Sequence, residues 1–229
     1  MSYQAPFVDA ATSVDPVNRN NTFISYYSYG SALGLSLDLA LRNEKGNLTL
    51  DGFMKSVWKT YGKNEKPYTI DNLNKALNTY AGKLFGDNFF SNYIYKSAMP
   101  NYEPLFKKVG IVLKQDSKNV FLGVSTSNGV VRNNAQIGSP AYKAGINSGD
   151  KIIAIDNYVV SDRNSVNSIL NNYKIGDKVT IQYSRYNVLK KVKITLIKDP
   201  RYTIISFEKA GKEVSPEVLK NRKDWLDKK

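Results

Sequence analysis

The run of residues 138–156 constrains the fold of this chain more than any other stretch. It begins with Ser139-Pro140, a favoured N-cap residue followed by the residue that best opens a helix, so a one-turn helix is predicted there. Gly145 suits the left-handed stop of that helix, and Gly149-Asp150 suits a tight turn. The strand that follows is expected to direct Ile152, Ile153 and Ile155 toward a core. A short helix, a turn and a buried strand are structural elements, not catalytic ones.

From Asn119 onward, short β-branched runs alternate with glycine turns. Such runs predict strands, and helical stretches at 140–144 and 163–173 interrupt them. Five or six short strands with two helices indicate a small α+β or partly open barrel domain. The expected strands cover 120–124, 130–131, 151–155, 179–183 and 192–196.

Up to about residue 113 the pattern is helical instead. Residues 31–41 are too apolar on all sides for a surface helix, so a buried helix is expected there. Further helices are expected to begin at polar N-caps or after a Gly-Asp pair. These starts are Thr49, Thr69, Gly86-Asp87 and Asn101. The residues expected on the buried faces are Phe53, Met54, Val57 and Trp58, then Leu73, Ala76, Leu77 and Tyr80, then Phe89, Phe90, Tyr93 and Ile94, and finally Leu105 and Phe106.

The two patterns divide the chain into three predicted segments. Residues 1–113 form a helical subdomain, residues 114–200 form a β-rich domain, and residues 201–229 form a basic tail. In that tail, Ser215-Pro216-Glu217-Val218 has the pattern of a helix start, so a terminal helix is predicted after it. The expected fold class is therefore α+β, with an N-terminal helical subdomain followed by a β-rich domain.

The composition excludes the commonest catalytic chemistries. The chain has no cysteine and no histidine. Disulfides, thiolate nucleophiles, Cys-ligated zinc and iron–sulfur clusters are thereby excluded. Ser–His and Cys–His catalysis and the H-E-x-x-H zinc motif are excluded as well.

The net charge of +13 lies mostly in the second half: residues 1–113 carry +3 and residues 114–229 carry +10. Nucleic-acid binding needs such charges clustered on one face with aromatic or helical readers. Here they alternate with apolar residues in strands or fill the tail, so a solvated basic surface is expected and no nucleic-acid partner. No apolar run approaches the length of a membrane span, and the first residues do not form a secretory signal.

Residues 138–156 resemble the G-S-P-A-x-x-A-G-Φ-x-x-G-D-x-I-x-x-I-[DN] core of PDZ domains, especially those of bacterial proteases. The resemblance implies a PDZ-like β-rich domain that binds an extended peptide as an added strand. It also implies that backbone N–H groups of an x-Φ-G-Φ loop hold the peptide carboxylate. The implied peptide-binding residues are Phe121, Leu122, Gly123 and Val124 in the loop, and Val166 and Leu170 on the facing helix. Core packing is the alternative explanation for Leu122, Val124, Val166 and Leu170.

Residues 20–42 are similar to the S-Y-Y-x-K-G-x-[AL]-x-x-x-x-L-D-L-x-[IL]-R stretch of glycyl-aminopeptidase-like zinc metallopeptidases. Further similar stretches lie at 48–62, 66–69, 200–202 and 223–226, in the same order. Proteins of that family have a thermolysin-like catalytic domain followed by a PDZ domain. The resemblance implies that this chain is the C-terminal part of such a protein, with residues 1–113 forming the C-terminal half of the catalytic domain.

The same resemblance implies what the chain lacks and what it retains. The family's H-E-x-x-H helix and its downstream glutamate are absent, so no catalytic zinc site is expected here, and zinc is expected in the longer protein. A tyrosine that stabilises the oxyanion of the tetrahedral intermediate corresponds to Tyr27, with Tyr26 as the fallback. Tyr29 stands where the family usually has lysine. The alternative is that these tyrosines simply pack at a helix start.

Two functions from different classes follow. The first is a fragment of a PDZ-containing zinc aminopeptidase that acts on peptides with N-terminal glycine or alanine, inactive alone and partnered by the N-terminal catalytic half. The second is a non-enzymatic PDZ adaptor or peptide-binding protein. Both imply peptide or protein C-termini as partners. The family resemblance favours a bacterial periplasm or cell envelope for the longer protein, and the sequence leaves the cytoplasm open.

Overall fold

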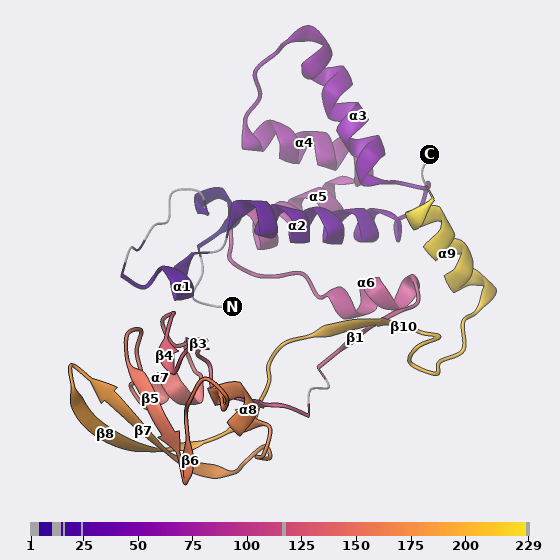
Figure 1. The fold of residues 1–229 in the computed structure, drawn as a ribbon. Coiled ribbons are helices and arrows are strands. Elements are labelled where there is room, and N and C mark those ends of the chain that lie inside the picture. The colour runs from indigo at the N-terminus through magenta and orange to yellow at the C-terminus, as the bar shows by residue number, and fades with distance from the viewer. Residues whose placement is uncertain (1–4, 11–14, 16, 24, 116–117, 228–229) are drawn as a thin grey trace. The chain divides into compact units, whose positions relative to one another are not determined.

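A computed structural model describes residues 5–10, 15, 17–23, 25–115 and 118–227 (Figure 1). Contacts divide the chain into two compact units. The helical unit comprises residues 1–16, 22–113 and 204–229, and the β-rich unit comprises residues 17–21 and 114–203. One boundary between the units falls after residue 113. The C-terminal tail is grouped with the helical unit, and the short segment 17–21 is grouped with the β-rich unit.

The helical unit is built mainly from helices and one pair of strands. Its principal helices are α2 (Tyr26–Leu41), α3 (Leu50–Thr60), α4 (Ile70–Ala81), α5 (Lys83–Phe89), α6 (Tyr102–Lys108) and α9 (Pro216–Leu226). Single turns are η1 (Phe7–Asp9), η2 (Gly62–Asn64) and the π-helical η3 (Phe90–Ile94), and the short α1 (Arg19–Thr22) crosses between the two units. Strand β1 (Ile111–Lys114) pairs with β10 (Thr203–Ser206).

None of the described helices combines the length and apolar character needed to cross a membrane.

The expected caps set several helix starts. The Thr49 hydroxyl accepts a hydrogen bond from the Gly52 N–H at 3.0 Å, and Thr69 and Asn72 form a reciprocal capping box. Helix α2 begins at Tyr26, earlier than the predicted start at residue 31.

The Gly86-Asp87 pair lies inside α5 and does not precede it. A Cβ at Gly86 would lie 2.1 Å from Asn78 Oδ1, so this glycine allows α4 and α5 to approach closely. Close helix packing, and not a turn, explains the residue.

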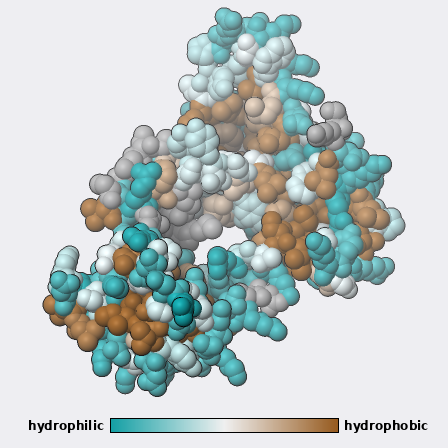
Figure 2. Space-filling view, viewed as in Figure 1, coloured by the Kyte–Doolittle hydropathy of each residue, from teal (hydrophilic) through white to brown (hydrophobic). Residues whose placement is uncertain are grey.

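The core of the helical unit contains most of the expected side chains. Figure 2 shows hydrophilic residues at the tip of the α3–α4 hairpin and hydrophobic residues nearer its base. The prediction that Met54 and Trp58 share the buried face of α3 is wrong, because both are exposed. The main cluster of buried residues is Leu37, Leu41, Phe53, Val57, Leu77, Phe89 and Phe90.

Arg222 makes several of the hydrogen bonds that attach the C-terminal helix to this unit. Arg222 on α9 donates hydrogen bonds to the carbonyls of Val109 (2.9 Å) and Gly110 (3.0 Å), at the junction of α6 and β1. The same guanidinium pairs with Glu208 at 2.6 Å. Because these carbonyls end α6, the arginine satisfies acceptors that the helix itself leaves open.

The β-rich unit contains an antiparallel sheet with strand order β3-β4-β5-β7-β8, to which β6 adds beside β5. A separate antiparallel pair joins β2 and β9. The strands are β2 (Val120–Phe121), β3 (Thr126–Ser127), β4 (Val130–Val131), β5 (Lys151–Ile155), β6 (Tyr158–Val159), β7 (Lys178–Arg185), β8 (Val188–Thr195) and β9 (Ile197–Lys198). The helices are α7 (Pro140–Lys143) and α8 (Val166–Leu170). Helix α8 is shorter than the predicted stretch 163–173, because Ser165 caps it.

The glycine-rich run of residues 138–156 is held to the sheet by an ion pair. The Asp150 side chain is 2% exposed and receives two hydrogen bonds from Arg185 on β7, each 2.7 Å long. Arg185 also donates to the Gly145 carbonyl at 2.6 Å, and the Asn147 N–H donates to Asp150 at 2.8 Å. Asp150 accordingly raises the pKa of Arg185 further above its ordinary value.

Replacing Asp150 with alanine is expected to destabilise the β-rich unit by about 3 kcal/mol, because Arg185 loses its buried partner. In the full-length chain, amide hydrogen exchange at Ile155 and Ile181 should accelerate by about 100-fold. The matched control is Asp162→Ala at an exposed carboxylate, which should leave these rates unchanged. Equal rates in the two variants would show that the ion pair does not stabilise the unit.

Candidate functional site

A groove of about 440 Å³ lies in the β-rich unit. One wall is the chain around β2 and the loop after it, and the other includes the end of α8. Its lining residues are Asn119, Val120, Phe121, Leu122, Gly123, Val124, Ser125, Asn133, Asn167, Leu170, Asn171, Asp199 and Arg201.

The loop after β2 presents unpaired backbone donors in this groove. Within the described part of the chain, the N–H groups of Leu122, Gly123 and Val124 donate to no protein acceptor. The carbonyls of Leu122 and Gly123 are both occupied, by the N–H groups of Ala141 and Gln136 at 2.9 Å each. The loop is therefore anchored through its acceptors, while three consecutive donors stay available to a ligand.

Gly123 is required by the contact between this loop and α7. Its φ is +93°, and a Cβ there would lie 2.1 Å from both Cβ and Oγ of Ser139. Ser139 is buried and caps α7, accepting a hydrogen bond from the Tyr142 N–H at 3.2 Å. The glycine-rich run thus supports the loop that supplies the donors.

Of the two α8 residues expected at the groove, Leu170 lies in its lining and Val166 does not. Asn167, Leu170 and Asn171 line the groove, as residues three and four positions apart on one helix face do. Val166, expected at the groove wall, is instead fully buried in the core with Ile169. Leu170, 6% exposed, belongs to the same core cluster but also lines the groove, so the two residues differ in their access to it.

Leu122 and Val124 take part both in the core and in the groove. The Leu122 side chain is buried in the core cluster, and Val124 packs against that cluster. Their backbone N–H groups nevertheless belong to the groove. Phe121, the last residue of β2, pairs with Ile197 of β9 and lines the groove as well.

A hydrogen-bonded tyrosine fixes the segment after α8 to the sheet. The Tyr173 hydroxyl donates to Asp156 at 2.9 Å, and Asp156 also accepts the Thr180 N–H of β7 at 2.7 Å. Burial, followed by the hydrogen bond to Asp156, raises the pKa of Tyr173 to about 12. The phenol therefore stays protonated and remains a donor at any ordinary pH.

Polar groups in the groove were not found from the sequence. For Asn167 and Asn171, the sequence offers only their spacing of four residues, which places both on one face of a helix. Asp199 and Arg201 form an ion pair in the lining. The Arg201 guanidinium holds the pKa of the Asp199 carboxyl below its usual range, so the pair stays ionised at neutral pH.

The three tyrosines at the start of α2 differ in exposure. Tyr29 is 4% exposed and packs edge-on against Phe7, with ring centroids 5.4 Å apart. Tyr27 is 73% exposed, and Tyr26 lies beside it at 4.4 Å between ring centroids. A hydrogen bond with Tyr27 raises the pKa of Tyr26. Aromatic packing in the core therefore explains Tyr29, whereas Tyr26 and Tyr27 present their rings at the surface of the unit.

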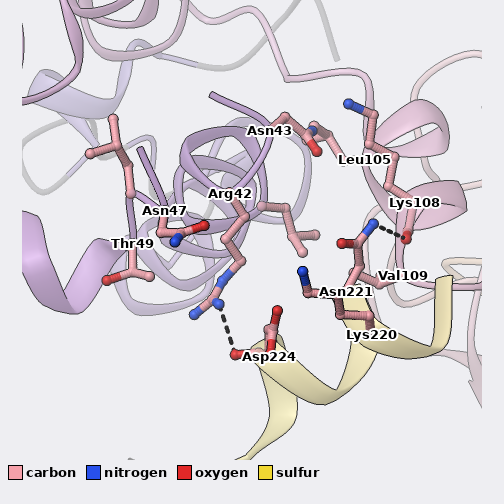
Figure 3. Close-up of a pocket in the computed structure, with 12 residues that line it drawn as sticks. Arg42, Asn43, Asn47, Thr49, Leu105, Lys108, Val109, Lys220, Asn221 and Asp224 are labelled. Carbon is pink, nitrogen blue, oxygen red and sulfur yellow. Dashed lines mark hydrogen bonds between the residues drawn. The ribbon is translucent and has the colours of Figure 1, made fainter. Parts of the chain in front are cut away.

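A second cavity, of about 290 Å³, lies in the helical unit where α2, α6 and α9 meet (Figure 3). The guanidinium of Arg42 donates to the Asp224 carbonyl at 2.9 Å, and Asn221 donates to the Lys108 carbonyl at 3.3 Å. Both bonds join α9 to the ends of earlier helices. The cavity therefore marks where the C-terminal helix is attached.

The residues of this chain do not fit a zinc ion. The sequence contains no histidine or cysteine. In the part of the chain that the structure describes, no three acidic side chains come together as metal ligands.

Comparison with known proteins identifies the β-rich unit. Residues 108–196 match the family model of the PDZ domain. No curated protein matches the chain.

Among solved structures, 93% of the chain matches the crystal structure of an aminopeptidase N family protein from Idiomarina loihiensis, at 27% identity and a TM-score of 0.74. The chain spans 38% of the length of that protein's chain. A shorter match is the HtrA-type protease AlgW with a decapeptide, at 22% identity over 36% of this chain and 30% of that chain, with a TM-score of 0.31. Another is a serine endoprotease from Yersinia pestis, at 22% identity over 35% of this chain and 29% of that chain, with a TM-score of 0.30.

The expected fold class is confirmed: the chain is a mixed helix-and-sheet protein with helices toward its N-terminus and a PDZ domain, a peptide-binding type of module, over residues 108–196.

Proposed function

We propose that the groove of the PDZ domain binds the free C-terminal end of an extended peptide. The observation that carries this proposal is the row of unpaired N–H groups at Leu122, Gly123 and Val124 beside the apolar side chain of Leu170. A carboxylate is the ligand group that accepts several converging N–H donors best. Leu170 would receive the last apolar side chain of the peptide.

The sheet offers the peptide a place to add as a strand. Strand β3 stands at the end of the strand order and follows the loop directly. A peptide whose carboxylate sits at the loop would pair along this edge by main-chain hydrogen bonds. Asn167 on α8 and Asn171, which follows the helix as its C-cap, would face the peptide with amide groups, so specificity beyond the last residue would come from polar contacts.

We also infer that the chain is part of a zinc aminopeptidase acting on peptides with N-terminal glycine or alanine. The similarity to an aminopeptidase N family structure and the motif at 20–42 support this. Zinc would be held by residues outside this chain, in an N-terminal catalytic half that would be its partner, so the chain alone would be inactive. When bound, zinc would polarise the scissile carbonyl.

In that enzyme, the contribution of this chain's helical unit would be a phenol. Tyr27 is the most exposed of the three tyrosines and would donate its hydroxyl proton to the developing oxyanion. Such a donor stabilises the transition state without adding a charge. The alternative, a non-enzymatic PDZ adaptor, retains the groove and assigns no role to Tyr27.

A short acetylated peptide ending in Val-Leu is expected to bind the full-length chain with a dissociation constant on the order of micromolar. In an NMR titration, the amide signals of residues 121–124 and 167–171 should shift. Amidating the peptide C-terminus should weaken binding about tenfold or more, because the charge held by the N–H groups is lost. Shifts confined to other residues, or no loss on amidation, would contradict the proposal.

Two alanine variants separate the loop geometry from general backbone strain. Gly123→Ala should abolish peptide binding, since its Cβ cannot fit against Ser139. Gly138→Ala imposes a similar positive φ, of +82°, but meets no atom within 4 Å and should bind the peptide almost normally. Amide hydrogen exchange of Ile155 and Ile181 would verify that both variants remain folded.

In the longer protein, Tyr27→Phe is expected to lower kcat by about 100-fold with little change in KM, as loss of one oxyanion donor does. Tyr26→Phe is the matched control and should retain most of the activity. If Tyr26→Phe were the impaired variant, the assignment would shift by one residue. If both were fully active, neither phenol would take part in catalysis.

A further inference from the structure

An ion pair lies at the end of the groove that precedes the loop of residues 122–124. Strand β9 pairs with β2, so that Val120 faces Lys198, and the Asp199 N–H then donates to the Asn119 carbonyl at 3.2 Å. This pairing brings the chain after β9 beside the entry to the loop. Asp199 and Arg201 consequently line the groove together with Asn119 and Val120.

The ion pair with Asp199 fixes the guanidinium of Arg201 but uses only part of its N–H donors. Asp199, whose side chain is 4% exposed, accepts from Arg201 Nε at 3.0 and 2.9 Å and from Nη2 at 2.5 Å. The Arg201 side chain is 80% exposed, and its Nη1 has no acceptor among the residues that the structure describes. A fixed fork with a free edge is the geometry that carboxylate recognition uses.

We propose that Arg201 binds the C-terminal carboxylate of the peptide and that Asp199 is the positioning residue that aims it. This inference rests on the proposed function of the groove. The carboxylate would be shared between the N–H groups of residues 122–124 and the guanidinium. Side chains upstream in the peptide would run along β3, away from Arg201, so the arginine reads the free chain end and excludes internal segments of a protein.

Asp199 gives the arginine a second role. Without Arg201, the Asp199 carboxylate would remain in the lining as an uncompensated negative charge close to the peptide carboxylate. Like charges in a shared site repel. The loss of Arg201 alone should therefore weaken binding more than the loss of both charges together.

The test measures binding of the acetylated Val-Leu peptide, as free acid and as amide, to the full-length chain by calorimetry. Arg201→Gln should weaken binding of the free acid tenfold or more and change binding of the amide by less than about twofold. The double variant Asp199→Asn with Arg201→Gln should regain part of the loss. The matched control, Lys198→Gln, removes an equal charge from exposed β9 outside the groove lining and should bind both peptides normally.

The outcomes separate this inference from the proposed function. If Arg201→Gln weakened the acid and the amide equally, the arginine would be structural. If it weakened neither, the N–H groups alone would bind the carboxylate. Either result would overturn the inference while leaving the groove intact. If the wild-type chain bound neither peptide, or bound them equally, the proposed function would fail and this inference with it.

Discussion

The geometry of the groove depends on the buried ion pair between Asp150 and Arg185. That pair fixes the turn at 145–150 against β7. Because this turn directly follows α7, it also fixes the position of α7. Ser139, the N-cap of α7, lies directly against Gly123 of the loop after β2. A carboxylate that is almost fully buried therefore determines, through three successive contacts, where three backbone donors are presented.

The two walls of the groove differ: the loop after β2 is rigid, and the side formed by the end of α8 is polar. The loop has no side-chain freedom to lose at Gly123, and the segment after α8 is held by the bond from Tyr173 to Asp156. The side chains of Asn167 and Asn171 are exposed and polar by comparison. If the groove binds peptides as proposed, its fixed loop would select a free chain end, and its polar helix side would accept varied sequences before that end.

Local rules allowed much of this fold to be predicted, and long-range contacts account for what was missed. The caps at Thr49, Thr69 and Ser139 satisfy donors within one turn, so the sequence alone reveals them. Strands β1 and β10 carry no comparable signal, because each is short and its partner lies far away along the chain. The loop of the groove followed from its motif. By contrast, the rotation of α8 and the place of Arg201 depend on sheet packing and on the β2–β9 pairing.

The pairing of β1 with β10 makes the β-rich unit an insertion within the helical one. The chain leaves the helical unit through β1 and returns to it through β10, and α9 then attaches by way of Arg222. The helical unit is therefore not continuous in sequence. During synthesis α9 emerges from the ribosome only after residues 114–203, so the inserted residues can fold before α9 is available to the helical unit.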